Sequence, residues 1–338
     1  MGIAFDVLWQ DGMNSTGCEL FSKSSQAIVE TGFAAAASST KPFGKSDDRH
    51  AFLISAIHWH SHKETGLLSS VDRPIGGTLA AHLRATMLGT NGEHIVFSHG
   101  FGTDQAAWSQ IAPPLSVGAR CVLFDLPGAS PLLPASFDER RYRSIAGYAD
   151  DLLNLLDELE ISRCTYVGHS VSGMVGVLAA IEAPERFSKL VLLNASPRYI
   201  NCPGYVGGFE TGEIDALLEA MSSNYQAWVA GFSSLVMPAG LPSALADFSA
   251  GLLSMRPDVS TRIARMIFEG DTRHILPQLK VPTLLLQSRE DVAVPPEVAA
   301  YLLAQLPAAE LKWIEAAGHL PHMSAPDQVL EVLREHLH

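Results

Sequence analysis

Short apolar runs bounded by Gly, Pro, Asp or Ser recur between residues 94 and 314, and each of them predicts a β-strand. Most of these runs are continuously apolar rather than alternating. That pattern is typical of central parallel strands, which are covered on both faces. The predicted strands are His94–Ser98, Cys121–Phe124, Cys164–Val167, Leu190–Leu193, Thr283–Gln287 and Leu311–Ile314.

Helical periodicity fills the spaces between several of these strands. Tyr148–Leu159 has apolar residues at positions 148, 152, 155, 156 and 159, which form one face of a helix. Met174–Ile181 and Gln328–Leu337 also read as helices. Strands that alternate with helices predict an α/β fold with a doubly wound, mostly parallel sheet.

The alternation stops between residues 197 and 274, where only helical segments are predicted, at 214–221, 225–232, 245–253 and 259–268. We expect this stretch to be an all-helical lid that closes a pocket over the sheet. Its aromatic side chains predict an apolar pocket for a small, uncharged ligand. They are Tyr205, Phe209, Tyr225, Trp228, Phe232, Phe248 and Phe268.

Residues 1–80 lack clean periodicity and contain Ser-, Thr- and Ala-rich patches, so we expect a poorly ordered N-terminal extension followed by one folded domain over 81–338. Its Ser content fits an organellar transit peptide, but acidic residues such as Asp6 and Glu19 oppose plastid targeting. Three alternating histidines, His58, His60 and His62, could face one side of a strand, but without a fourth ligand we predict no metal site.

The overall charge and the cysteine spacing exclude several classes of protein. A net charge of −13 over 338 residues argues against nucleic-acid and anionic-membrane partners, which favour clustered Lys and Arg. The four cysteines have no metal-ligand spacing and indicate reduced thiols. Since the sequence has no apolar run of about 18 residues, we predict no membrane span and an intracellular protein.

Candidate chemistry begins at Tyr166–Gly173, where the predicted strand breaks at Gly168-x-Ser170 and a small-residue helix follows. A strand, a sharp turn and a helix make a nucleophile elbow, which raises one serine hydroxyl above the sheet. The pattern G-x-S-x-G would place glycine at 172, but the chain has Ser172 followed by Gly173. Serine is still small, so we predict that Ser170 is the nucleophile.

An acid and a histidine in later loops complete a candidate triad. Asp291 follows the strand at 283–287, and we favour it over its neighbour Glu290. His319 follows Gly318 in a turn and is preferred to His322, while Asp125 precedes the serine and is expected to brace its loop. The order Ser, Asp, His is that of the α/β-hydrolases, and this chemistry needs no cofactor or metal.

The loop His99–Gly102, directly after the strand at 94–98, provides the other part of such a site. Glycines there allow backbone N–H groups to point into a cleft and bind an oxyanion. We expect the two donors to be the amides of Phe101 and Val171, the residue after the nucleophile.

Longer motifs resemble one group of α/β-hydrolases: the strigolactone and karrikin receptors (Dwarf-fourteen, karrikin-insensitive-two and Dwarf-fourteen-like proteins) and their bacterial relative RsbQ. The resemblance covers residues 79–338, lid included, and this group tolerates a residue other than glycine at position 172. The motifs that carry it are His99–Trp108, Gly168–Met174, Ser196–Tyr199, Gly207–Glu210, Ser223–Trp228 and Gly318–Pro321.

The resemblance implies a slow hydrolase of butenolides that, when liganded, recruits an F-box protein and co-repressors through its lid. It also implies pocket residues, namely Phe101, Tyr205, Trp228, Phe232, Phe248 and Phe268. Phe232 stands where strigolactone receptors tend to have Tyr, which favours the karrikin-type or Dwarf-fourteen-like branch. We expect a monomer with a cytoplasmic and nuclear location.

Two departures from the group keep another function open. The stretch Asp125–Gly128 is more similar to general hydrolases, and the long N-terminal extension has no counterpart in the receptors. The alternative is a general carboxylesterase with fast turnover, or an RsbQ-like stress-signalling regulator with a protein partner.

Overall fold

The computed structural model describes residues 73–74, 78–129 and 137–337. The predicted extension, residues 1–80, lies almost wholly outside this part of the chain, as do His58, His60 and His62. At its end, Arg73–Pro74 form β1, which pairs antiparallel with β2 (Thr86–Leu88). The short helix α3 (Thr78–His82) separates the two strands.

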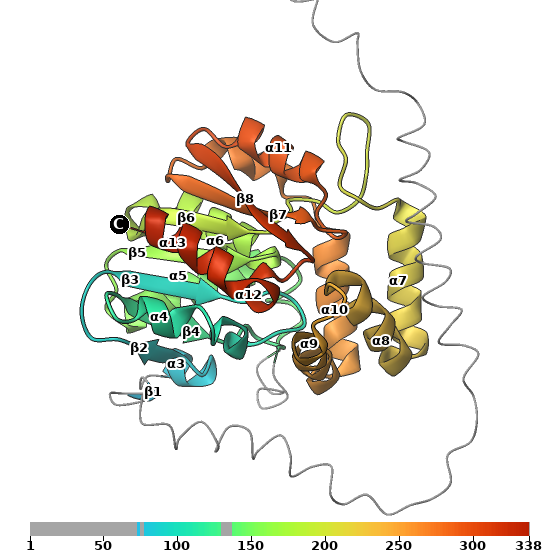
Figure 1. Cartoon of the computed structure of the whole chain (residues 1–338), viewed down its shortest axis with the longest axis horizontal. Coiled ribbons are helices and arrows are strands. Elements are labelled where there is room, and N and C mark those ends of the chain that lie inside the picture. Colours follow the sequence, from blue (N-terminus) through green and yellow to red (C-terminus); the bar gives the residue numbers. More distant parts are fainter. Residues whose placement is uncertain (1–72, 75–77, 130–136, 338) are drawn as a thin grey trace, which may run out of the picture. The chain divides into compact units, whose positions relative to one another are not determined.

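An eight-stranded sheet in the order β1-β2-β4-β3-β5-β6-β7-β8 forms the centre of the described domain (Figure 1). Every pair from β4 to β8 is parallel, whereas β2 is antiparallel to β4. The parallel sheet of the α/β-hydrolase prediction is thereby confirmed. The parallel strands are β3 (His94–Ser98), β4 (Arg120–Phe124), β5 (Cys164–His169), β6 (Phe187–Leu193), β7 (Thr283–Glu290) and β8 (Ala309–Ala317).

Helices bury both faces of the sheet, as the continuously apolar strands require. Val96 of β3 packs in one hydrophobic cluster, while its neighbours Ile95 and Phe97 pack in the other. The first cluster includes α3, α5 (Ala146–Glu158), α6 (Val171–Glu182) and α11 (Pro296–Gln305). The second includes the 3₁₀ turn η3 (Gln105–Trp108), α4 (Ala112–Leu115) and α13 (Pro326–His336).

The lid consists of four helices inserted between β6 and β7, as predicted for residues 197–274. They lie together beside the sheet in Figure 1. Asn224 begins α8, because its side chain accepts a hydrogen bond from the backbone N–H of Ala227 at 3.0 Å. The helices are α7 (Thr211–Ser223), α8 (Tyr225–Val236), α9 (Pro242–Ser254) and α10 (Pro257–Phe268).

Within the described residues, none of these helices combines the length and apolarity needed to cross a bilayer.

Candidate active site

Ser170 lies in the turn between β5 and α6 with a φ of +56° and a ψ of −125°. A positive φ is costly for a residue with a side chain, and such strain is typical of functional turns. Two backbone bonds hold the turn: the N–H of Ser170 donates to the carbonyl of Leu193, and the N–H of Gly173 donates to the carbonyl of Ser170, both at 2.9 Å. The nucleophile elbow is therefore a fixed backbone feature.

Close packing explains why glycine stands at 173 rather than at 172. A Cβ on Gly173 would lie 2.5 Å from the Cβ of Ala195, which is closer than real Cβ contacts allow. Ser172 has room, and its hydroxyl donates to the carbonyl of His99 and accepts from the hydroxyl of Ser98 at 2.9 Å. The serine at this position thus links the elbow to the end of β3.

Three side chains from separate loops form a continuous hydrogen-bonded triad. His319 places Nε2 2.9 Å from Oγ of Ser170 and Nδ1 2.8 Å from Oδ2 of Asp291. The other carboxylate oxygen of Asp291 accepts the backbone N–H groups of Ala293 at 2.8 Å and Val294 at 3.1 Å. With Nδ1–H donating to the carboxylate, Nε2 is free to accept the serine proton.

The acids that compete with Asp291 lie elsewhere. Glu290 has an exposed side chain. Asp125 is fully buried, but its carboxylate accepts the backbone N–H of Gln105 and the guanidinium of Arg84, each at 2.9 Å. Asp125 therefore braces the chain after the oxyanion loop, whereas the sequence analysis expected it to brace the loop that follows Asp125 itself.

Asn194 is a part of the site that the sequence analysis missed. It directly follows β6, has a φ of +46° and is fully buried. Its Nδ2 donates to Asp291 at 2.7 Å and to the hydroxyl of Ser288 at 3.0 Å, while its Oδ1 accepts the N–H of Ser288 at 3.1 Å. Asparagine tolerates this backbone conformation better than most residues, so one side chain can hold the acid in place. An amide directly after a buried strand was the available signal.

Replacing Asn194 with glycine is expected to lower kcat on an aryl ester by about 10- to 100-fold with little change in KM. Glycine accepts the positive φ, so the variant removes only the amide. A hydrogen bond to a charged group is worth about 1.5–3 kcal/mol, here spent on orienting Asp291. Steady-state kinetics test this, and an unchanged kcat would contradict a positioning role.

The two predicted oxyanion donors are the amides of Phe101, in the loop after β3, and of Val171, directly after Ser170. Among the described residues, neither the amide of Phe101 nor that of Val171 donates to another protein group. The amide of Val171 is the first of helix α6, where N–H groups are unsatisfied and the helix dipole favours a negative charge. A Cβ on Gly100 would lie 2.5 Å from Nδ1 of His169 and 3.1 Å from the Cβ of Ser170. Glycine there lets the loop approach the elbow.

A stack of buried rings supports the loop that holds His319. His169 donates from Nε2 to the backbone carbonyl of His319 at 2.8 Å, and its ring lies 4.5 Å from that of His322. The ring of His322 stacks on Trp108, also at 4.5 Å. Burial, aided by neighbouring imidazoles, lowers the pKa of His322 to about 3 and holds the pKa of His169 well below its ordinary value. Both rings are therefore neutral supports.

Stability is expected to fall as the pH drops from about 6.5 towards 3. The unfolded chain protonates these histidines near pH 6.5 while the folded protein keeps them neutral, so each costs about 1.4 kcal/mol per pH unit. His322→Phe keeps a ring against Trp108. In urea unfolding, this variant should lose about 1.4 kcal/mol less unfolding free energy per pH unit below pH 6.5 than the wild type does. The exposed His82→Gln is the control, and an equal slope in His322→Phe and the wild type would contradict the assignment.

Aromatic side chains enclose a pocket of about 20 Å³ directly over Ser170 and His319. Tyr199 belongs to one of the motifs that carry the resemblance, but it was not predicted as a site residue. Its hydroxyl lies 3.3 Å from Oγ of Ser170. A pocket of this volume holds about one water molecule, so a larger ligand requires the lid side chains to move apart. The apolar residues among its walls are Phe101, Phe232, Phe248, Ile267, Phe268, Ala293 and Leu320.

Two of the expected pocket residues, Tyr205 and Trp228, do not line this pocket. The hydroxyl of Tyr205 donates to the carbonyl of Arg198 at 2.7 Å and its ring packs edge-on against Tyr301, so it is directed away from the pocket. Trp228 stacks on Phe232 at 4.9 Å and lies behind that ring rather than in the wall. Aromatic content predicted the pocket but could not give the direction of each ring.

Comparisons with known proteins agree with this geometry. A model of the Alpha/beta hydrolase family matches residues 95–332. The chain is 45% identical over 247 residues to the strigolactone esterase RMS3 of Pisum sativum, covering 72% of this chain and 92% of that protein. It is 44% identical over 254 residues to the karrikin insensitive 2 receptor CA of Petunia hybrida, covering 75% of this chain and 94% of that protein. A solved hydrolase from Oleispira antarctica matches with a TM-score of 0.73 and 29% identity, covering 76% and 95%.

The fold, the elbow and the family match together define an ester-hydrolysing serine hydrolase, and the chain belongs to the α/β hydrolase family. Within that family it belongs to the group that contains the strigolactone esterases and the karrikin insensitive 2 receptors. The resemblance found in the sequence is confirmed.

Proposed function

We propose that this protein binds and slowly hydrolyses a small apolar butenolide-type lactone or ester, and that the liganded form acts as a signal receptor. The observation that carries the proposal is the triad of Ser170, His319 and Asp291 beneath an aromatic pocket formed largely by the lid. The relatives named above are esterases and receptors, which supports both halves of the proposal.

Each part of the site has a chemical role in this reaction. Ser170 attacks the carbonyl carbon while His319 takes the hydroxyl proton and returns it to the leaving oxygen. Asp291 keeps the imidazole in the required tautomer. The amides of Phe101 and Val171 stabilise the oxyanion, each donor being worth about 3–4 kcal/mol in comparable sites. A water molecule then releases the acyl group by the same steps.

A direct hydrogen bond joins the catalytic histidine to the lid. The backbone N–H of His319 donates to the carbonyl of Val236, at the end of α8, at 2.8 Å. Gly318 adjoins the same segment, because a Cβ there would lie 2.6 Å from Cδ of Pro238. A ligand attached to His319 or Ser170 would therefore disturb the lid, which supports a receptor role.

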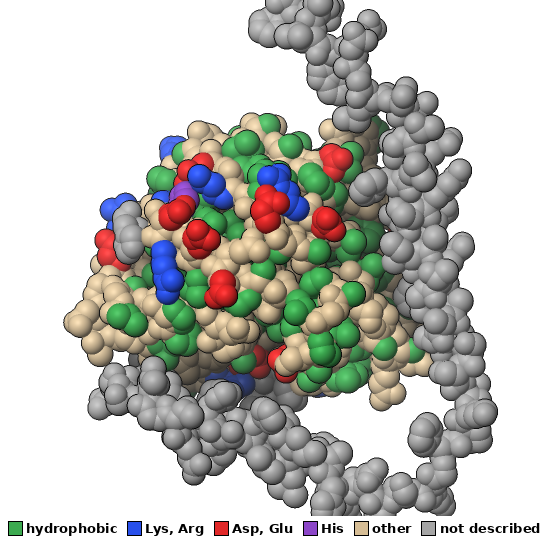
Figure 2. Space-filling view, in the orientation of Figure 1, with side chains coloured by type: hydrophobic (Ala, Val, Ile, Leu, Met, Phe, Trp, Pro, Cys, Tyr) green, Lys and Arg blue, Asp and Glu red, His purple; other side chains and the backbone are tan. Residues whose placement is uncertain are grey.

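The lid surface supports a protein partner. Across α8 and α9 the only charged residue is Asp247, and Leu253 is half exposed. Figure 2 shows hydrophobic side chains gathered over this part of the molecule. We propose that an F-box protein and co-repressors bind here, and that the protein is a monomer of the cytoplasm and nucleus.

Thermal melting with a synthetic enol-ether butenolide tests the receptor half. The wild type should melt at a lower temperature with the ligand, by about 2–4 °C for each kcal/mol of unfolding free energy lost. The melting temperature of Ser170→Ala should not change with the ligand. A simple aryl ester provides the comparison. Rapid multiple turnover of the aryl ester with no melting shift would favour a general carboxylesterase or an RsbQ-like regulator.

A further inference from the structure

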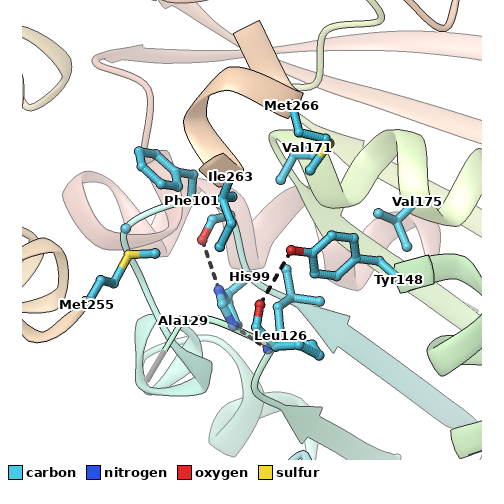
Figure 3. A pocket seen from close by; sticks show the side chains of 13 residues that line it. His99, Phe101, Leu126, Ala129, Tyr148, Val171, Val175, Met255, Ile263 and Met266 are labelled. Atoms are coloured by element: carbon cyan, nitrogen blue, oxygen red, sulfur yellow. Dashed lines mark hydrogen bonds between the residues drawn. The ribbon is translucent and has the colours of Figure 1, made fainter. Parts of the chain in front are cut away.

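A second cavity adjoins the oxyanion loop (Figure 3) and shares Phe101 with the catalytic pocket. The oxyanion loop, the loop after β4, helices α5 and α6 and the lid form its walls. Figure 3 shows side chains from these elements converging on one space. Those used below are Phe101, Tyr148, Val171, Met255, Ile263 and Met266.

This cavity begins beside the reacting serine. Phe101 lines both the second cavity and the catalytic pocket, so the two spaces meet at this residue. Gly100 and Val171 also line the second cavity; Val171 directly follows Ser170, and a Cβ on Gly100 would lie 3.1 Å from the Cβ of Ser170. The two expected oxyanion donors, Phe101 and Val171, thus belong to its wall.

The walls are suited to hydrocarbon. None of the described lining residues carries a full charge, and the polar ones are already hydrogen-bonded. His99 accepts the N–H of Leu126 at 2.9 Å through Nε2, and the hydroxyl of Tyr148 lies 3.4 Å from the carbonyl of Pro127. An apolar group therefore leaves no buried polar atom without its partner.

The size and composition of the cavity indicate a short group. It measures about 20 Å³, which is the space of about one water molecule, so a group of a few carbons enters only if the walls adjust. Met255 and Met266 form part of the wall, and unbranched methionine side chains adapt readily to the shape of a ligand. On the methionine side the cavity can therefore expand to take a group a few carbons longer. On the other side Val171 and Ile263 are stiff at χ1 and keep their positions.

We propose that this cavity is the acyl subsite of the enzyme. It takes a short apolar substituent on the acyl side of the scissile ester or lactone, while the aromatic pocket takes the leaving group beside His319. The proposal rests on the proposed ester hydrolysis and adds the division of the substrate between two compartments. Met266 and Phe268, two residues apart on α10, line the second cavity and the aromatic pocket respectively.

Aryl esters with one leaving group and acyl chains of about two to eight carbons test the proposal. The wild type should prefer a short chain above acetate, since each accommodated methylene is worth about 0.8 kcal/mol, or roughly 4-fold in kcat/KM. Met266→Ala should shift the optimum to longer chains, and Met266→Phe should shift it towards acetate. Phe268→Leu should instead change the selectivity among acetates with different leaving groups.

The outcomes separate this proposal from the proposed function. If the wild type hydrolyses aryl esters but the Met266 variants keep its acyl profile, or if wild-type rates fall steadily from acetate, the acyl subsite is overturned. If the wild type hydrolyses no ester at all, the proposed hydrolysis fails and the acyl subsite falls with it. Should Met266→Ala not fold, the wild-type profile and Met266→Phe still decide.

Discussion

Replacing Ser170 with alanine is expected to lower kcat/KM on a simple aryl ester by roughly 10⁵- to 10⁶-fold. The serine hydroxyl lies 2.9 Å from Nε2 of His319 and is held there by the strained elbow. Without it, His319 has no nucleophile to deprotonate, and only binding and the oxyanion donors contribute to the residual rate. Initial-rate kinetics on purified protein measure the loss.

The exposed Ser109→Ala is the matched control and should keep wild-type activity. Both variants should melt close to the wild type, because alanine retains the backbone of the elbow. Residual activity of Ser170→Ala above about one-hundredth of wild type would show that another group performs the attack.

Replacing Asp291 with asparagine is expected to lower kcat by about 10⁴-fold. Two backbone N–H groups, those of Ala293 and Val294, fix an oxygen at the Oδ1 position. The amide nitrogen of the variant must therefore occupy the Oδ2 position, where it faces Nδ1 of His319. Nδ1 must then accept a hydrogen bond from the amide, so the imidazole carries its proton on Nε2. Nε2 can no longer accept the proton of the serine hydroxyl.

The neighbouring acid provides the control for this change. Glu290→Gln removes an exposed carboxylate directly beside Asp291 in sequence and should leave kcat and KM at wild-type values. A loss in Glu290→Gln comparable with that in Asp291→Asn would reverse the assignment of the triad acid.

The sheet and the triad could be predicted from the sequence because their signals are local. Continuous apolar runs identify strands buried on both faces, and the strand-turn-helix pattern at Gly168–Gly173 requires small residues whatever surrounds it. Asp291 and His319 each follow a predicted strand, and parallel strands bring their carboxyl ends to one edge of the sheet. The antiparallel β2 escaped prediction because three residues show no periodicity.

The remainder of the site depends on tertiary contacts that no local pattern encodes. Asn194 and Ser288 are bonded across adjacent strands although they lie 94 positions apart in the chain. The neutral His322 is recognisable only once its burial against Trp108 is known. Likewise Tyr205 and Tyr199 look alike in sequence, yet only the hydroxyl of Tyr199 approaches Ser170.

One residue, His319, connects the active site to the lid. His319 is hydrogen-bonded to Oγ of Ser170 through its side chain and to the carbonyl of Val236, at the end of α8, through its backbone N–H. Slow release of product from this site would keep the lid disturbed for as long as the ligand remains. Hydrolysis and signalling would then be two consequences of one contact.

Intact-mass spectrometry during reaction with an enol-ether butenolide shows whether the ligand stays attached at the residues that contact the lid. We expect a long-lived adduct on the wild-type protein, mapped by peptide analysis to His319 or Ser170, and no adduct on Ser170→Ala. Turnover of the butenolide with only unmodified protein throughout the time course, or an adduct of equal yield on Ser170→Ala, would contradict the account.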